Sequence, residues 1–171
     1  MRHEQPASVP IKLLLGHYHA LNEHWQQALE EYTECFKEAP DEPLVPLCTG
    51  TALLHFAMSR KVPSRDRAVK QAFAFLNCYT RLKQAPQENA YNLGRACHQL
   101  GLNTLAVKYY EKALACKVVV PGEVGQPASE ALENRRFCDL RRETAHNLSL
   151  IYCNSGAPNL ARAVLRQYGT I

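Results

Sequence analysis

The sequence has little of what membrane, secreted and disulfide-rich proteins carry. No apolar run reaches the roughly 18–20 residues that a helix needs to cross a bilayer, so no membrane association is expected. The first ten residues, MRHEQPASVP, lack the apolar core of a signal peptide, and nothing indicates secretion. The seven cysteines are scattered and form no CxxC pair, which favours reduced thiols in the cytosol or nucleus.

Motifs that carry chemistry are equally scarce. Neither a GxGxxG motif nor a P-loop occurs, so the glycines do not mark a phosphate site. His17 and His19 would face different directions on a helix, and no acid or cysteine completes a metal site around them. Cys97 and His98 are adjacent, so on a helix they diverge by about 100° and cannot meet as nucleophile and base. We therefore expect no enzyme activity, no cofactor, no metal and no small-molecule substrate.

What the sequence does have is a repeated spacing of small and large residues. Gly94 is followed at offsets of 12, 16 and 19 by Ala106, Tyr110 and Ala113. Gly16 and Ser149 begin the same series, which continues as Ala28, Tyr32, Cys35 and as Ala161, Leu165, Tyr168. Small residues at such offsets allow two helices to touch. A helix pair of this kind needs neighbouring copies to bury its remaining apolar surface.

These offsets resemble those of tetratricopeptide repeats. They predict an all-α, right-handed superhelical solenoid of about four helix-turn-helix repeats. We place the repeats at 9–40, 43–83, 86–116 and 136–168, as a single array over 1–171. Gly94 and Ser149 lie 55 residues apart, against about 34 for one repeat. An inserted extended loop is therefore expected at 117–135, between the third and fourth repeats.

Apolar spacing sets the expected helices. It predicts helices over 9–22, 25–39, 47–58, 64–83, 135–155 and 158–168, with the third pair opening at Pro86 or Gln87. The apolar set of the first helix is Ile11, Leu14, Leu15, Tyr18 and Leu21. The second repeat is irregular. If Gly50 starts it, then Ala68, Ala72 and Phe75 match only with about six residues inserted around 60–65.

Charge is spread unevenly along the chain. The formal net charge is +4, yet residues 1–45 hold three bases against eight acids, a net of −5. Residues 58–85 hold seven bases against one acid, a net of +6. One interpretation is two solvated helix faces of opposite sign. The other is a basic ridge for an acidic protein segment or a phosphate backbone, with Arg65, Arg67 and Lys70 as its residues.

The first helices of such repeats are expected to line a concave surface that can hold a peptide. By position, the lining in the third repeat consists of Tyr91, Asn92, Arg95, His98 and Gln99. In the fourth repeat it consists of His146, Asn147 and Asn154. These eight residues are the candidate partner-binding residues of the array.

Longer strings narrow the resemblance to one family. YNLGRACHQLGLNTLAVKYYEKAL (91–114) and DLRRETAHNLSLIYCNSGAPNLARAVLRQYGTI (139–171) look like the C-terminal region of the tetratricopeptide subunit of RNA polymerase III general transcription factor IIIC. AFAFLNCY and PDEPLVPLCTG resemble that subunit as well. The strings YNLGR, HQLGL and NLSLIY are more specific than the general repeat pattern.

This resemblance implies a scaffold in a nuclear complex that recognises the internal promoters of transfer RNA genes. It implies docking of other factor IIIC subunits and support for recruiting initiation factor IIIB, with promoter DNA reached indirectly through the complex. The alternative is a helical-repeat module that contacts nucleic acid directly through the basic region 60–83. Steeply salt-dependent binding would favour that alternative.

Overall fold

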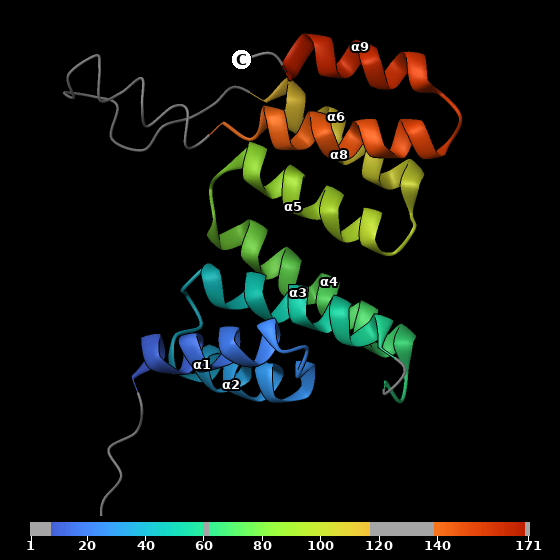
Figure 1. Ribbon diagram of the computed structural model, residues 1–171. Coiled ribbons are helices and arrows are strands. Elements are labelled where there is room, and N and C mark those ends of the chain that lie inside the picture. The colour runs from blue at the N-terminus through green and yellow to red at the C-terminus, as the bar shows by residue number, and fades with distance from the viewer. Residues whose placement is uncertain (1–7, 60–61, 117–138, 170–171) are drawn as a thin grey trace, which may run out of the picture. The chain divides into compact units, whose positions relative to one another are not determined.

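The computed structural model describes residues 8–59, 62–116 and 139–169, and every regular element in these ranges is an α-helix. The predicted loop at 117–135 lies outside them. In chain order the helices are α1 (Val9–Leu21), α2 (Trp25–Glu38), α3 (Leu44–Met58), α4 (Arg65–Leu82), α5 (Pro86–Gln99), α6 (Asn103–Ala115), α8 (Arg141–Asn154) and α9 (Pro158–Tyr168) (Figure 1). No helix among the described residues combines the length and the apolar character needed to cross a membrane.

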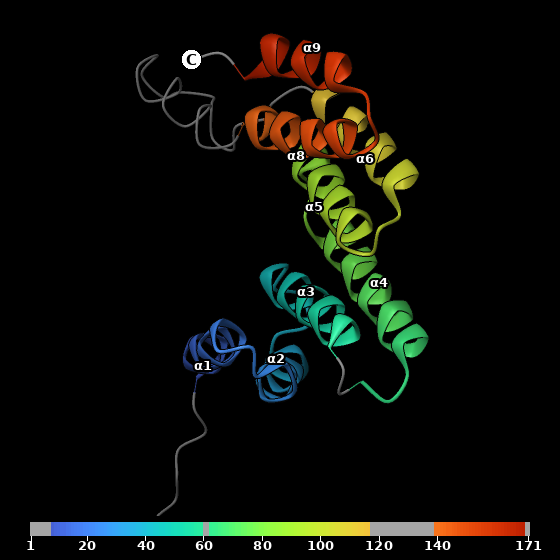
Figure 2. The ribbon, with the colours of Figure 1, turned by 45° about the vertical axis from the view of Figure 1, so that its right-hand side comes forward.

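The chain divides into two compact units, Met1–Gln84 and Ala85–Ile171. In the first unit, α1 pairs with α2 and α3 pairs with α4, while α3 also packs against α2. In the second unit, α5 pairs with α6 and α8 pairs with α9, while α8 also packs against α6. Figure 2 shows these helix pairs from a second direction. Each unit is thus built from tetratricopeptide-type pairs in which a first helix also covers the second helix of the pair before it.

Glycine lets the two helices of a pair approach closely. Gly94 is buried in α5, and a Cβ atom there would lie 2.6 Å from the ring of Tyr110 on α6. Gly16 of α1 meets the ring of Tyr32 on α2 in the same way. Both tyrosines are buried. The offset of 16 therefore places a ring in the space that a side chain on the first helix would otherwise occupy.

The turns inside the first, third and fourth pairs have a left-handed residue seven positions after the small residue. Gly101 has φ +76° and Gly156 has φ +77°, a conformation that glycine adopts without steric cost. In the first pair the same position holds Glu23, at φ 58°. A side chain there is strained, because Cβ crowds the following carbonyl in this region.

In the second pair, the alignment of α4 with α3 differs from the one expected from the sequence. A Cβ on Gly50 would lie 2.9 Å from Cγ of Leu76, so Leu76 takes the place of Tyr32 and Tyr110. Ala68 and Ala72 are buried as well, but Phe75 is only half-buried. Leu76 follows Gly50 by 26 residues instead of 16, so the insertion is ten residues rather than about six. Part of it is one additional helical turn at the start of α4.

Two helix starts also differ from expectation. α3 begins at Leu44 rather than at Leu47, and Pro46 lies in its first turn, where a backbone N–H has no helical partner to lose. The helix expected over 135–155 is not continuous, because Asp139 and Leu140 are not helical and α8 begins at Arg141. Residues 135–138 lie outside the described ranges. The Asp139 carboxylate accepts hydrogen bonds from the backbone N–H and the guanidinium of Arg141.

The apolar set expected for the first helix does not pack against the second. α1 contacts α2 through Leu13, Ala20 and the hydrogen bond between His17 and Tyr32. The five residues of the apolar set are exposed instead: Ile11, Leu14, Leu15, Tyr18 and Leu21. We call them the outer face of α1. The helix is therefore apolar on both sides.

Candidate partner-binding surface

Within the second unit, hydrogen bonds join α5 to α8 and to the two residues that precede α8. The Nδ2 atom of Asn147 donates to the hydroxyl of Tyr91 at 3.4 Å. Gln87 is buried, and its Nε2 donates to Asp139 at 3.4 Å while its Oε1 accepts from the backbone N–H of Leu140 at 3.2 Å. These bonds hold the first helices of two successive pairs beside each other.

A buried tyrosine of α6 supports the neighbouring side chains of α5. The ring of Tyr110 lies 6.3 Å from that of Tyr91 and 6.1 Å, edge-on, from that of His98. Its hydroxyl is 3.4 Å from Nδ1 of His98. The guanidinium of Arg95 lies 5.8 Å from the centre of the Tyr91 ring, within the range of a cation–π contact.

The charge of this surface at neutral pH depends on which of its groups are buried. Burial lowers the pKa of His98, so its imidazole is neutral near pH 7. Burial raises the pKa of the Tyr110 phenol, which stays protonated. Arg95 is exposed and contributes a guanidinium group. The surface therefore offers one fixed positive charge among neutral hydrogen-bonding groups.

The structure brings four of the eight candidate residues into one connected group. Tyr91, Arg95, His98 and Asn147 are joined by the contacts just described, and we call them the Tyr91–Asn147 face. Asn92 and Gln99 are half-buried on the same helix, α5. His146 and Asn154 are exposed on α8, and no contact described for the chain joins them to α5. The binding role of all eight residues stays a prediction.

The apolar spacing of the sequence indicated packing roles alone for Tyr110 and Tyr152. The hydroxyl of Tyr152 on α8 donates to Glu111 of α6 at 3.4 Å, a contact that depends on how two pairs stack. The sequence signal for Tyr110 is that a tyrosine stands at offset 16 in both the first and the third pairs. The tyrosine at offset 16 in the first pair, Tyr32, also reaches a histidine of the preceding helix, with 2.7 Å between its hydroxyl and Nδ1 of His17.

The basic stretch of α4 does not form one continuous ridge. Arg65, Arg67 and Lys70 are all exposed, which both interpretations of the basic region require. Arg67 and Lys70 lie three residues apart and share one side of the helix. Arg65 is turned about 140° from Lys70, and its guanidinium lies 3.5 Å from the sulfur of Met58. Residues 60 and 61 lie outside the described residues.

Groups that resemble a chemical site are engaged in packing. His17 is hydrogen-bonded to Tyr32, and His19 lies with its ring 6.3 Å from that of His24. Cys97 is buried, and burial raises the pKa of its thiol, which opposes formation of a reactive thiolate. In residues 8–59, 62–116 and 139–169, no three His, Cys, Asp or Glu side chains gather where they could hold a metal ion.

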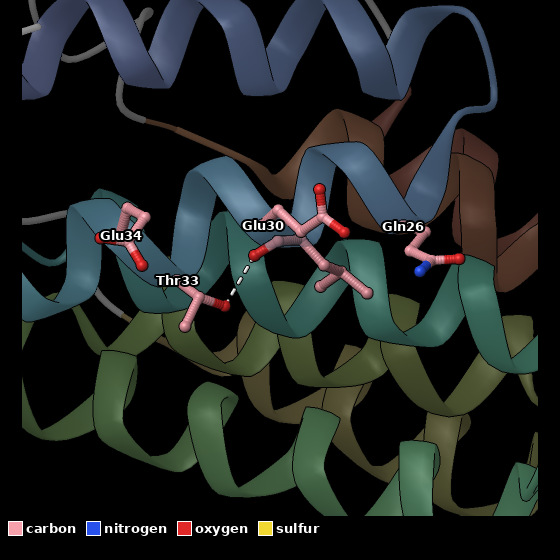
Figure 3. A pocket seen from close by; sticks show the side chains of 5 residues that line it. Gln26, Glu30, Thr33 and Glu34 are labelled. Carbon is pink, nitrogen blue, oxygen red and sulfur yellow. Dashed lines mark hydrogen bonds between the residues drawn. The ribbon is translucent and has the colours of Figure 1, made fainter.

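An open hollow runs along α2, and one helix supplies all of its lining: Gln26, Leu29, Glu30, Thr33 and Glu34 (Figure 3). The Thr33 hydroxyl donates to the backbone carbonyl of Leu29 at 2.6 Å. Figure 3 shows the carboxylates of Glu30 and Glu34 along the same side of this helix. Because the described residues that line it all lie on α2, the hollow is open to solvent.

Comparison with known proteins agrees with this architecture. A family model described as tetratricopeptide repeat matches residues 88–115. Human general transcription factor 3C polypeptide 3 is 39% identical over 98% of this chain and 18% of its own length. Transcription factor tau subunit sfc4 of Schizosaccharomyces pombe is 38% identical over 92% of the chain and 16% of its own length. The chain thus spans less than a fifth of the length of these curated relatives.

Among solved structures, a crystal structure of MamA protein covers 94% of the chain and is itself covered to 89%, at 17% identity and a TM-score of 0.47. The assignment of the repeat type therefore depends on the helix pairs and on the family match, not on this likeness.

Proposed function

Because this chain belongs, over the stretch that it covers, to the family of tetratricopeptide subunits of transcription factor IIIC, we propose that it is a protein–protein interaction scaffold in that factor. Its role is to dock another subunit of the complex. Through that assembly it supports recruitment of initiation factor IIIB at transfer RNA gene promoters in the nucleus, and it reaches promoter DNA only indirectly.

The observation that carries this proposal is the Tyr91–Asn147 face. Two successive first helices, α5 and α8, present hydrogen-bonding groups that one contact already joins. A peptide backbone offers both donors and acceptors, so amide and hydroxyl side chains suit an extended segment. The exposed guanidinium of Arg95 adds a preference for an acidic side chain, since arginine binds carboxylates through two parallel hydrogen bonds. We therefore propose a partner segment that carries an acidic residue.

The test is capture of the separately purified subunits of factors IIIC and IIIB by this chain over a range of salt. Salt-resistant capture of one subunit is expected. Arg95→Glu should weaken capture about tenfold or more, because the acidic side chain of the partner is then buried in the interface without its positive partner. Arg162→Glu is the matched control, because Arg162 is an exposed arginine of the same unit on α9. Equal loss in both variants, or no loss in either, would contradict a role for this face.

Direct nucleic-acid binding predicts a different pattern. Capture of no subunit, together with DNA binding that falls steeply with salt, would favour that alternative. Such binding should be lost when Arg65, Arg67 and Lys70 are reversed in charge and should survive Arg95→Glu.

A further inference from the structure

The side of α4 that faces away from its core is polar, basic and exposed. The buried side of this helix holds four residues: Ala68, Ala72, Leu76 and Tyr79. The opposite side holds five exposed residues at i, i+3, i+7, i+10 and i+14: Arg67, Lys70, Ala74, Asn77 and Arg81. We call these five residues the outer stripe of α4. Arg65 is turned away from Lys70 and does not belong to it.

The helices that pack against α4 use other sides of it. Leu76 faces Gly50 of α3 on the buried side. Phe75, on one flank, meets Phe36 of α2 with ring centres 5.3 Å apart. On the other flank Phe73 is half-buried. The outer stripe lies about 180° from the centre of the buried side, because each residue turns the helix by about 100°. It is therefore not part of the packing within the first unit.

The outer stripe carries positive charge alone. Asp66 is the one acid in the 18 residues of α4, and it lies in the first turn, where the helix dipole favours a carboxylate. Among the residues that the structure describes, no ion pair or hydrogen bond engages the side-chain nitrogens of Arg67, Lys70 or Arg81. These three groups are therefore open to a negatively charged partner.

The dimensions of the stripe suit another helix. Arg67 and Arg81 are 14 residues apart, which corresponds to about 21 Å along the axis. Ala74 lies midway between them, and its small side chain allows a second helix to approach closely. The backbone of α4 is already hydrogen-bonded within the helix, so it offers an extended segment no backbone partners. A helical segment satisfies its own backbone and needs none.

We propose that the outer stripe of α4 docks an acidic α-helix of a partner protein. Carboxylates of that helix pair with Arg67, Lys70 and Arg81, and a small residue of it lies against Ala74. Arginine suits this role because it binds carboxylates through two parallel hydrogen bonds. The stripe belongs to the first unit, so it is a second docking surface, separate in sequence and in chemistry from the Tyr91–Asn147 face.

The neighbouring helix argues against a nucleic-acid backbone as the occupant. α2 contacts α4 through Phe36 and Phe75, and Glu30 and Glu34 are exposed along it (Figure 3). An α-helix is about 10–12 Å wide with its side chains, so it can lie along α4 alone. The major groove of a duplex is itself about 12 Å wide, with a phosphate backbone on either side. A duplex on α4 would therefore also meet the carboxylates of α2.

A photo-crosslinking residue in place of Ala74 tests the proposal in the 171-residue chain. The chain would be irradiated with each separately purified subunit of factor IIIC at low salt and, in parallel, with a transfer RNA gene duplex. Crosslinking to one subunit is expected, within a helical segment whose carboxylates lie on one side. The same photo-crosslinking residue in place of Ala163, an exposed alanine of α9, is the matched control and should not reach that segment.

Charge reversal identifies the contact. The triple variant Arg67→Glu, Lys70→Glu and Arg81→Glu should lower the Ala74 crosslink about tenfold or more, since three exposed ion pairs are lost. Lysines in place of the carboxylates of the crosslinked segment should restore it. Circular dichroism of the triple variant should match that of the unmodified chain, because all three side chains are exposed. An unchanged crosslink in the triple variant would contradict the proposal.

The remaining outcomes separate this surface from the proposed docking function. The Ala74 crosslink should fall as salt rises, because exposed ion pairs are screened, and it should survive Arg95→Glu. A crosslink to the duplex, to a segment without acids or to nothing at all would overturn the acidic helix as occupant. Loss of the crosslink in Arg95→Glu would overturn a separate surface. Salt-resistant capture that persists without an Ala74 crosslink would overturn this proposal and leave the docking function standing.

Discussion

At the scale of single residues, the contact between a small residue and a ring fixes the geometry of each pair. A Cβ on Gly94 would lie 2.6 Å from two ring atoms of Tyr110, closer than carbon atoms approach in proteins. In the fourth pair Ser149 holds the small position, and the residue at offset 16 is Leu165, which is 40% exposed, in place of a buried ring. The size of one partner is therefore limited by the size of the other.

Gly94→Ala should accordingly destabilise the chain by about 1–3 kcal/mol, since the Tyr110 ring must move out of a packed core. Tyr110→Leu in the same chain should recover part of that loss, as the Ser149–Leu165 combination suggests. Urea unfolding of the two single variants and the double variant measures the coupling between the sites. Additive free energies of unfolding would show that the ring is not what excludes the side chain.

Glu23 is a site where a substitution should add stability. It occupies the left-handed turn position that glycine holds in the third and fourth pairs. That conformation costs a residue with a Cβ about 1–2 kcal/mol, and the added freedom of unfolded glycine offsets about 0.4–1 kcal/mol of the gain. Glu23→Gly should therefore raise the free energy of unfolding by up to about 1.6 kcal/mol. Glu23→Ala, which removes the charge but keeps Cβ, should give no such gain in the same denaturation experiment.

Asp139 should make the stability of the second unit sensitive to acid. Hydrogen bonds from the Arg141 side chain hold the pKa of Asp139 below its usual value, so the carboxylate is favoured in the folded chain. A lowered folded-state pKa gives stability that is present above the unfolded pKa, about 3.9, and is lost as the pH falls through the folded value. Asp139→Asn should thus be less stable than the unmodified chain at pH 5–7, and the difference should shrink below about pH 4.

Chemical denaturation at several pH values measures this difference. Arg141→Gln removes the partner and should reduce the same pH dependence. A stability difference for Asp139→Asn that is constant from pH 3 to pH 7 would show that the carboxylate contributes no titratable stability.

At the scale of elements, the extra turn of α4 decides which of its side chains belong to the core. Leu76 is buried and faces Gly50, while Phe75 is half-buried and meets Phe36 of α2 edge-on, with ring centres 5.3 Å apart. One helical turn shifts the matched residue by four positions, so the core moves from the Ala72 register to the Leu76 register.

Leu76→Ala should cost about 2–5 kcal/mol, because it leaves a cavity against a glycine that cannot fill it. Phe75→Ala should cost less, despite the larger side chain that is lost, since part of the ring is already in contact with water. Thermal and urea unfolding of both variants would decide between the registers. A larger loss for Phe75→Ala would restore the six-residue insertion.

At the scale of the whole molecule, the division into Met1–Gln84 and Ala85–Ile171 makes each unit a candidate for independent folding. Each unit has its own buried residues and two pairs that stack through a shared helix contact. Stability in repeat proteins is approximately a sum of repeat and nearest-neighbour contributions, so two stacked pairs retain one such interface.

Fragments divided between Gln84 and Ala85 should therefore both remain helical and unfold cooperatively. Circular dichroism and urea unfolding provide the measurement. A division between Ala39 and Pro40 is the control, because it removes the α2–α3 contact inside one unit and should leave 1–39 largely unfolded. An unfolded 1–84 or 85–171 fragment would contradict independent units.

Much of the fold could be read from particular residues, and the reason is that their relations are local. In two pairs, a glycine on the first helix and a tyrosine on the second are only 16 residues apart, with one short connection between the helices: Gly16 with Tyr32, and Gly94 with Tyr110. The constant offset therefore reveals these contacts in the sequence. The candidate site was less accessible. The Tyr91–Asn147 contact spans 56 residues, including the stretch 117–138, whose length obscures the repeat period.

The sequence by itself determined the helix pairs, the small-residue positions and the family, because helical periodicity and short offsets are properties of neighbouring residues. Only the tertiary structure decided that the side chain at Gly50 is that of Leu76, with Ala72 contributing only its backbone carbonyl, since an insertion of any length preserves the periodicity on both sides of it. Only it decided which apolar side of α1 packs. Leu13 and Ile11 are equally apolar in the sequence, and the choice between their stripes depends on where α2 lies.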